Sequence, residues 1–334
     1  MFQIDDTRML ADARSSFTKG RKFSIYLELL IFLLVAWTAM LPQSVISTFI
    51  LTFLMVTDPA FISLIVNEAA TQTDILNYTM EFMNNTPSFV YAIMLFCSGF
   101  MILVAILYCR WFQKRQAYTL GFTKRNFLKE YLMGALIGTV MIALPALACV
   151  ATKCVSFNIS NNANPLMILV FFVAFVFQGM GEEALFRGYL LTSLSRGAKT
   201  WTAIIVSSLM FSLFHVANAN FGLISFLNIF LFGVFAAIFM LKRGSIWAAG
   251  AIHTFWNFFQ GNIFGFSVSG NPKFDTVLEA TGAGFGKILS GGEFGLEGGL
   301  GATIVLLIAI LIVLNIHTKK SELAKKDRFA DSNA

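Results

Sequence analysis

The chain has 334 residues, of which 57% are hydrophobic and only 13% are charged, and its net charge at neutral pH is +6. Its mean hydropathy of +0.73 lies well outside the range of soluble globular proteins. The basic residues gather in short blocks between apolar runs. That arrangement is typical of orientation signals in membrane proteins and not of a nucleic-acid-binding surface. The composition therefore predicts an all-α, polytopic membrane protein that binds lipid and no nucleic acid.

Apolar runs of about 20 residues mark the expected membrane crossings. The segment before the first run, residues 1–22, is polar and of mixed charge and has no cleavage-site pattern, so the first helix is expected to be an uncleaved anchor. About eight transmembrane helices are predicted, at residues 23–42, 87–109, 131–151, 165–195, 201–218, 220–241, 245–262 and 301–317.

The basic blocks predict how the chain is oriented. They precede the first predicted span and follow the second, fourth, sixth and eighth, so with eight crossings all of them fall on one side. The positive-inside rule then places both termini in the cytoplasm: the N-terminal segment 1–22 and the basic tail 318–334.

Two stretches outside these spans need their own interpretation. Within the N-terminal region 23–164, residues 43–86 contain Asp58-Pro59 and no Lys or Arg, so we expect an outer loop or interfacial segment that does not cross the membrane. Residues 263–300 are rich in Gly, Ser, Asn and Pro. This composition predicts a flexible outer loop or lid before the last helix.

Three charged residues, Glu182, Glu183 and Arg187, interrupt the apolar run 165–195. A charge within a bilayer costs roughly 2.5–3.5 kcal/mol or more, so such groups normally face a protein interior and serve a function. On a helix, Glu183 and Arg187 are four residues apart and are expected to form an ion pair. Glu182 is turned about 100° around the helix from Glu183 and has no evident cationic partner. An unpaired carboxylate of this kind is suited to be a general base.

Further polar residues lie on later predicted helices. His253 and Asn257 are four residues apart and share a helix face, where both can donate hydrogen bonds to the oxyanion of an attacked carbonyl. His215 lies in the predicted span 201–218. With a rise of about 1.5 Å per residue from the basic helix ends, these three residues and Glu182 reach similar depths. They are therefore expected to meet in one site.

The ordered set of motifs resembles a family of intramembrane proteases. This is the CPBP family, related to the type II CAAX prenyl endopeptidase and including Abi proteins of bacteriocin processing and self-immunity. The resemblance covers residues 165–262, the expected catalytic core. The family pattern is E-E-x-x-x-R, F-x-x-x-H and H-x-x-x-N, present here as Glu182-Glu183…Arg187, Phe211…His215 and His253…Asn257.

The resemblance implies an endopeptidase that cleaves a membrane-associated or lipidated peptide or protein. By the same resemblance Glu182 activates water, His215 holds or polarises it, and His253 with Asn257 binds the oxyanion. Glu183 and Arg187 would orient these groups, with Glu183 an alternative participant in the chemistry. The Gly-rich segment is similar to one that bacterial members carry, which implies a bacterial cell membrane.

Some alternatives stay open. The preferred mechanism requires no cofactor, but the family also bears the description of metalloprotease, and Glu182, His215 and His253 would offer zinc three ligands and an open position. A non-catalytic membrane scaffold or bacteriocin-immunity partner would not need every motif position intact. A small proton-coupled transporter could use Glu182 and the histidines as a relay, although the sequence has no evident repeat.

Overall fold

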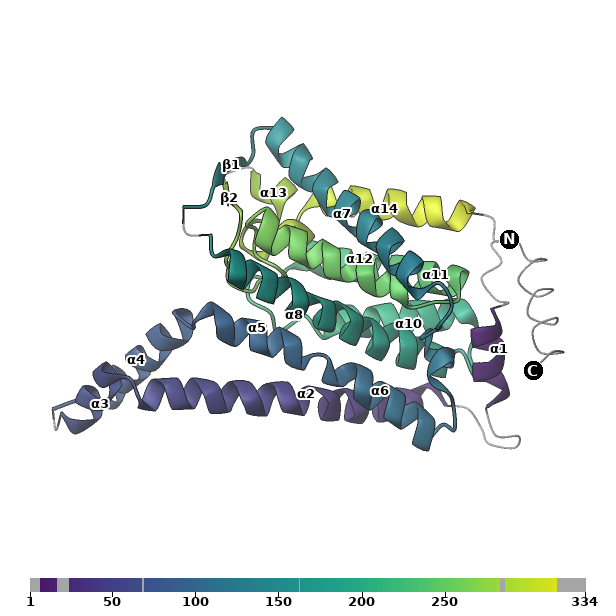
Figure 1. The fold of residues 1–334 in the computed structure, drawn as a ribbon, viewed down its shortest axis with the longest axis horizontal. Coiled ribbons are helices and arrows are strands. Elements are labelled where there is room, and N and C mark those ends of the chain that lie inside the picture. The colour runs from purple at the N-terminus through teal and green to yellow at the C-terminus, as the bar shows by residue number, and fades with distance from the viewer. Residues whose placement is uncertain (1–6, 17–23, 68, 162, 283–285, 317–334) are drawn as a thin grey trace.

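The structure, a computed structural model, describes residues 7–16, 24–67, 69–161, 163–282 and 286–316. Helices make up most of the described chain, and one short two-stranded sheet lies at one end of the bundle (Figure 1). The predicted class, an all-α polytopic membrane protein, is confirmed. The predicted basic tail 318–334 and most of segment 1–22 lie outside the described residues.

The described elements follow one another along the chain, with two π-helical segments (η2 and η3) and three short 3₁₀ turns (η1, η4 and η5) among the α-helices. They are α1 (Arg8–Ser15), α2 (Ile25–Val56), α3 (Pro59–Val66), α4 (Gln72–Asn84), α5 (Ser88–Cys97), α6 (Phe100–Trp111), η1 (Ala117–Leu120), α7 (Phe127–Ala151), β1 (Ser156–Ile159), α8 (Pro165–Glu183), η2 (Ala184–Leu191), α9 (Thr192–Leu194), α10 (Thr200–Leu213), α11 (Leu223–Arg243), α12 (Trp247–Phe258), η3 (Phe259–Ile263), β2 (Leu278–Thr281), α13 (Gly286–Ser290), η4 (Gly292–Phe294), η5 (Leu296–Gly298) and α14 (Leu300–Asn315).

Five helical stretches of the described chain are long and apolar enough to cross a membrane. Helices α10 and α14 are apolar but shorter, so the predicted count of eight crossings stays a prediction. The five long stretches are α2, α5 with α6, α7, α8 continued through α9, and α11.

The segment 43–86 differs from its expected form as an outer loop or interfacial piece. Helix α2 does not end near residue 42 but continues through Pro42 to Val56, and α3 and α4 follow as two further helices. A proline removes one backbone hydrogen bond, yet the other backbone groups of an apolar helix have no better partner than the helix itself. The helix therefore continues, and α2 extends past the rest of the bundle with α3 and α4 at its far end (Figure 1).

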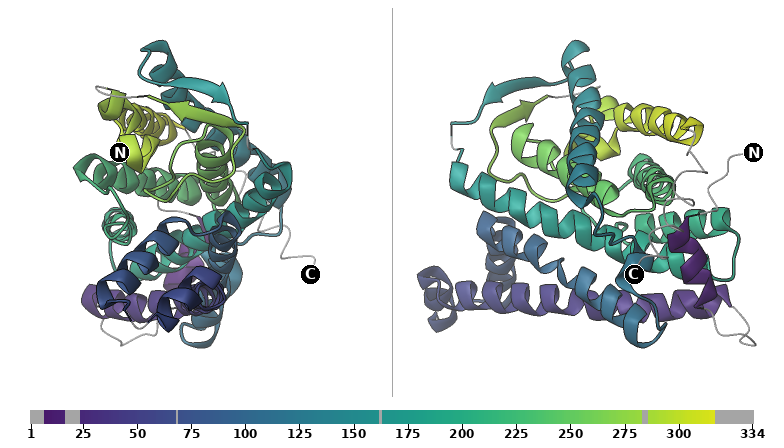
Figure 2. Two further views of the ribbon diagram at one scale, coloured as in Figure 1. Left: turned by 90° about the vertical axis from the view of Figure 1, so that its left-hand side faces the viewer. Right: turned by 45° about the vertical axis from the view of Figure 1, so that its right-hand side comes forward.

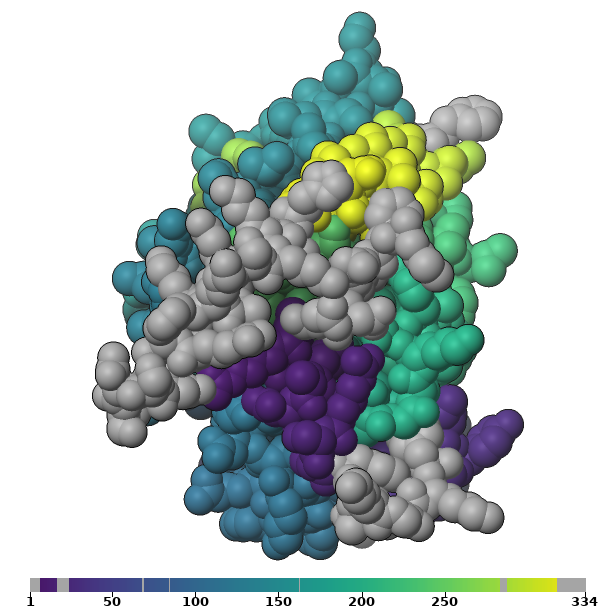
Figure 3. All heavy atoms as spheres, turned by 90° about the vertical axis from the view of Figure 1, so that its right-hand side faces the viewer, coloured from purple at the N-terminus to yellow at the C-terminus, as the bar shows by residue number. Residues whose placement is uncertain are grey.

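The basic-block residues that the structure describes lie at one end of the bundle. From α1, the guanidinium of Arg14 donates hydrogen bonds to the Ser195 carbonyl at 3.1 Å and to the Thr200 hydroxyl at 2.8 Å. From the end of α11, Lys242 Nζ donates to the Leu314 carbonyl near the end of α14 at 2.7 Å. Figure 3 shows α1 lying across this end of the molecule. Which side of the membrane it faces stays a prediction.

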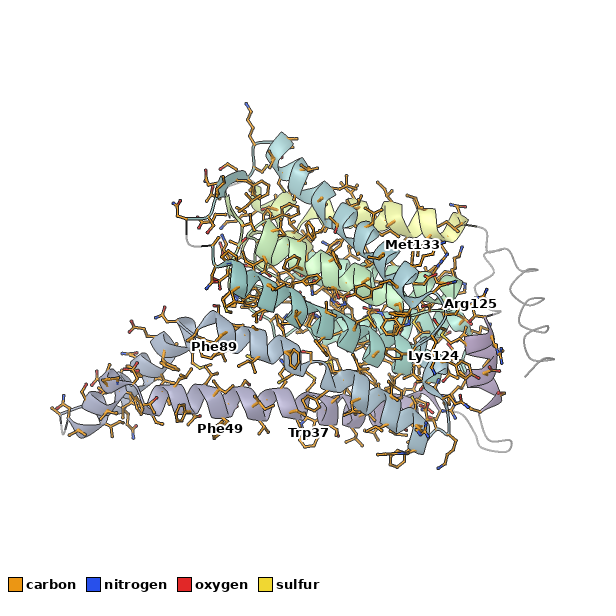
Figure 4. All side chains as sticks on the ribbon, in the orientation of Figure 1. Trp37, Phe49, Phe89, Lys124, Arg125 and Met133 are labelled. Atoms are coloured by element: carbon orange, nitrogen blue, oxygen red, sulfur yellow. The ribbon has the colours of Figure 1, made fainter. Side chains whose placement is uncertain are left out.

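The loop between α6 and α7 joins the same end. The Tyr118 hydroxyl donates to Asp12 of α1 at 2.6 Å. Burial and the bond to Asp12 raise the pKa of Tyr118 to about 12, so the phenol remains a donor at neutral pH. Lys124 and Arg125, in the same loop, are labelled at this end in Figure 4. Together these contacts hold α1 against the helix ends.

Helix α12 forms the centre of the bundle, packed between α7 and α8, while α11 packs against α10 and α14. Small residues bring α8 and α12 close together. A Cβ atom added at Gly179 of α8 would lie 2.7 Å from the backbone nitrogen of Thr254 in α12. This glycine therefore permits α8 and α12 to approach closely beside the charged motif.

Large apolar side chains cover the outer surface. On α2, Trp37 is 65% and Phe49 is 72% exposed, and on α7 Leu136 is 67% exposed. Figure 4 shows Trp37 and Phe49 on the side of α2 that faces away from the bundle. Such a continuous apolar exterior is suited to lipid contact and not to water.

The described parts of 263–300 form more regular structure than the expected flexible loop. Strand β2 pairs antiparallel with β1, with Ser156 opposite Thr281 and Ile159 opposite Leu278, and the two strands lie side by side in Figure 2. After β2, Phe294 and Leu296 are buried in the core. Gly295 between them has a φ of +95°, a conformation that favours glycine. The glycines thus build a tight fold over the bundle that composition alone does not distinguish from a flexible loop.

Candidate active site

The charged motif lies where α8 passes into the π-helical segment η2. Glu182 and Glu183 are the last residues of α8, and Arg187 lies within η2. Inserted π-helical turns are rare and occur often at functional sites. The junction turns Glu183 and Arg187 into the protein core, where both are fully buried.

Glu183 and Arg187 form the ion pair that their spacing predicts. Arg187 Nη1 donates to Glu183 Oε1 at 3.0 Å, and the guanidinium carbon lies 4.1 Å from the ring centre of Phe211. The same Glu183 oxygen lies 3.1 Å from Nδ1 of His253 on α12. Glu183 therefore links the cation of η2 to the histidine of α12 and fixes the orientation of the imidazole ring.

Glu182 occupies a different position from its neighbour. Its Oε1 accepts a hydrogen bond of 2.7 Å from Gln178, one helical turn earlier on α8. Its Oε2 lies 3.7 Å from His253 Nε2, too far for a hydrogen bond, and is buried with no hydrogen-bond partner among the described residues. Glu182 thus keeps one carboxylate oxygen available to accept a proton.

The hydrogen bonds that join Glu182, Gln178 and Asn257 fix the orientation of two side-chain amides. A carboxylate only accepts hydrogen bonds, so Gln178 must turn its amino group toward Glu182. Its carbonyl oxygen then accepts from the Asn257 amino group at 3.0 Å. Asn257 Oδ1 is left buried and, within the described chain, without a hydrogen-bond partner. Gln178 therefore couples Glu182 to Asn257.

His215 lies outside the helix in which it was expected. Helix α10 ends at Leu213, and His215 lies in the turn that follows, where its Nδ1 is 2.8 Å from the Phe211 carbonyl oxygen. Asn220, with a φ of +58°, belongs to the same connection. The Phe211 ring contacts both histidines edge-on, with ring centres 4.8 Å from His215 and 5.9 Å from His253.

Three of the predicted site residues line one cavity. Its volume is about 20 Å³, which is space for about one water molecule. Glu182 does not line the cavity itself. Gln178, to which it is hydrogen-bonded, and Asn257, which is hydrogen-bonded to Gln178, both do. The lining residues are Gln178, Phe211, His215, Asn228, Ile229, Phe232, His253, Trp256, Asn257, Ser269, Glu297 and Leu306.

The cavity also contains polar residues that the sequence analysis missed. Gln178 lies four residues before Glu182 in an apolar helix, a spacing that would have placed the two on one face. Glu297, Ser269 and Asn228 carry no comparable signal, because two of them come from the Gly-rich segment and reach the cavity only through its fold.

The zinc alternative requires Glu182, His215 and His253 to converge on one point. Among the described residues, no three His, Cys, Asp or Glu side chains are arranged to hold a metal ion. Of the two histidines, His253 directs Nδ1 to Glu183 and His215 directs Nδ1 to a backbone carbonyl. A histidine held through Nδ1 in this way keeps Nε2 for a ligand, as zinc-binding histidines do, so the zinc alternative stays a hypothesis.

Comparison with known proteins gives a family for the part of the chain that carries this site. No curated protein and no solved structure matched. Residues 164–259 match the family model described as type II CAAX prenyl endopeptidase Rce1-like. The match contains all three motifs, and it confirms the resemblance to CAAX-type proteases. The similarity of residues 164–259 to the Rce1-like type II CAAX prenyl endopeptidase family therefore supports an intramembrane endopeptidase in this multi-pass membrane protein.

Proposed function

We propose that this protein is an intramembrane endopeptidase in which Glu182 activates the attacking water. One observation carries the proposal: Glu182 has a buried carboxylate oxygen without a partner in the described chain, and it is bonded to a network whose other members line a water-sized cavity. A general base needs a free acceptor within reach of the proton that it removes.

The reaction begins with proton transfer. Glu182 accepts a proton from water, and the resulting hydroxide attacks the carbonyl carbon of the scissile peptide bond. His215 helps to hold the water. The attack produces a tetrahedral oxyanion, which the second N–H of Asn257 and a protonated His253 Nε2 stabilise by donating hydrogen bonds. The proton held by Glu182 then passes to the amide nitrogen as the carbon–nitrogen bond breaks.

Glu183 and Arg187 act by positioning other groups. Glu183 accepts from His253 Nδ1, which leaves Nε2 directed to the side where Glu182 lies. Arg187 neutralises Glu183, so that the carboxylate does not remain as an uncompensated buried charge. Neither residue lines the cavity.

The substrate class follows from the surroundings of the site. The site lies among helices with an apolar, lipid-suited exterior, so the proposed substrate is a membrane-associated or lipidated peptide or protein. We place the enzyme in a bacterial cell membrane with both termini in the cytoplasm, the side that the basic blocks favour.

The test compares the membrane peptidomes of cells that express the wild-type protein or the Glu182→Ala variant at equal levels. Peptides with new termini should appear with the wild type and be lost with the variant, because the variant lacks the base. His215→Ala and His253→Ala should lose the same peptides. Identical peptidomes in all four strains would refute an endopeptidase function.

A further inference from the structure

Two of the four cysteines lie together at the end of α7. Cys149 is in the last turn of the helix and is fully buried, whereas Cys154 follows the helix and is partly exposed. The structure shows both as free thiols. Neither residue lines the cavity of the proposed active site.

The turn that ends α7 is a Schellman motif. The Cys154 N–H donates to the Cys149 carbonyl at 2.9 Å, and the Lys153 N–H donates to the Val150 carbonyl at 2.9 Å. Lys153 has a φ of +57°, the left-handed conformation that this motif places just after a helix. The side chains at its first and last positions, here Cys149 and Cys154, are the ones that commonly contact each other.

The separation of the two residues suits a disulfide. With standard backbone bond lengths, the 2.9 Å hydrogen bond from the Cys154 nitrogen to the Cys149 oxygen keeps their Cα atoms within about 7 Å. Because the bonds are not collinear, the Cα atoms lie closer than this limit, beyond which two cysteines cannot be bridged. As a thiol, Cys154 Sγ accepts a hydrogen bond of 3.2 Å from the Thr152 hydroxyl, and sulfur is a weak acceptor.

The cysteines lie at the end of the bundle opposite the basic residues. Helix α7 starts just after Lys124 and Arg125 and runs for 25 residues to the end where β1 and β2 lie, away from α1 (Figure 1). In the proposed orientation this end faces away from the cytoplasm. Disulfides form and persist on that side of a bacterial membrane, whereas the cytoplasm keeps thiols reduced.

Cys154 is also the point where the segment 263–300 meets α7. A Cβ atom added at Gly282, directly after β2, would lie 2.3 Å from the Cys154 carbonyl oxygen. Phe157 of β1 stacks on Phe264 after α12, with ring centres 5.9 Å apart. A covalent bond at Cys154 would therefore hold the β1–β2 sheet, and the segment packed on it, against the end of α7.

We propose that Cys149 and Cys154 form a disulfide in the cell membrane and that this bond fixes the β1–β2 sheet to the end of α7. The inference rests on the proposed orientation of the chain and not on the proposed peptidase chemistry. A disulfide restricts the unfolded chain more than the folded one, so it stabilises this end of the protein.

The oxidant is the disulfide of an exported thiol–disulfide oxidoreductase. The thiolate of the exposed Cys154 attacks it, which forms a mixed disulfide and releases one thiol of the oxidoreductase. Cys149 then loses its proton and attacks Cys154 Sγ, which releases the second thiol. Two thiols of this chain thus lose two electrons and two protons, and the oxidoreductase gains both.

The first measurement counts free thiols. Bacterial cells that make the protein are lysed in denaturant with N-ethylmaleimide, and the chain is analysed by mass spectrometry before and after reduction. Of the four cysteines, Cys97 and Cys109 should be alkylated before reduction and all four after it. Trypsin cleaves after Lys153, between the two proposed partners, so the bridged form should yield two linked peptides.

The second measurement is thermal stability in detergent. The melting temperature of the wild type should fall by about 3 °C or more when dithiothreitol is added, because the bridge is lost. Cys154→Ser should melt at the temperature of the reduced wild type, with or without dithiothreitol. The matched control is Cys97→Ala, which should keep the fall on reduction.

Each result decides one point. Four alkylated cysteines before reduction overturn the disulfide. A linked pair whose reduction leaves the melting temperature unchanged overturns its role in fixing the sheet, as does a fall on reduction that persists in Cys154→Ser. A peptidome without Glu182-dependent cleavage leaves all of these results unchanged, so the two proposals fail separately.

Discussion

Replacing Glu182 by Gln should lower kcat by about 10²–10⁴-fold, the usual contribution of a general base. The Gln oxygen can still accept from Gln178, so the network around Asn257 is kept while the group that takes the proton from water is lost. Thermal stability in detergent should therefore change little. The measurement is the initial rate of cleavage of a substrate identified by the peptidome comparison, together with a melting curve.

The control for this prediction is Glu81→Gln, which changes an exposed carboxylate on α4 and should leave kcat unchanged. Loss of activity in Glu182→Gln with an unchanged melting curve supports the role of a base. Activity within a few-fold of the wild type would show that another group activates the water, with Glu183 the nearest carboxylate.

Replacing Arg187 by Met should destabilise the protein by about 3–5 kcal/mol and abolish cleavage. Arg187 and Glu183 are fully buried and joined at 3.0 Å, so the variant would leave the Glu183 charge with His253 as its remaining partner. An isolated buried charge is far more costly than a buried pair. The shift should appear as a lower melting temperature of the purified protein.

A double variant separates the effect on stability of losing the ion pair from the effect of losing side-chain packing. Glu183→Gln combined with Arg187→Met removes both charges and should recover part of the stability but none of the His253 orientation, so activity should remain low. Arg125→Met, an exposed arginine in the loop before α7, is the matched control and should melt like the wild type. An Arg187→Met variant as stable as this control would contradict the account of the pair.

The sequence was sufficient for those parts of the site that depend on helix geometry. The four-residue spacing predicts the Glu183–Arg187 pair and the shared face of His253 and Asn257, because neighbours on a helix are set by local backbone structure. The apolar runs predict the helical class for a similar reason, since a membrane permits few other forms.

The parts that were missed depend on tertiary contacts. Pro42 would end most helices in water, but α2 continues through it. His215 was assigned to a helix, whereas it lies in a turn. The position of Glu297 follows from contacts with Trp256, Ser269 and Asn228, which come from three separate parts of the chain. Neither local propensity nor spacing encodes such contacts.

The central claim, attack by water that Glu182 activates, is tested most directly by a single turnover in ¹⁸O-labelled water. Purified protein in liposomes is used in excess over a cleavable substrate, and both product and enzyme are analysed by mass spectrometry. Direct attack by water predicts one ¹⁸O atom in the new C-terminal carboxylate and none in the Glu182 side chain. Unlabelled product with ¹⁸O in Glu182, the result expected if Glu182 itself attacks the peptide, would contradict the account.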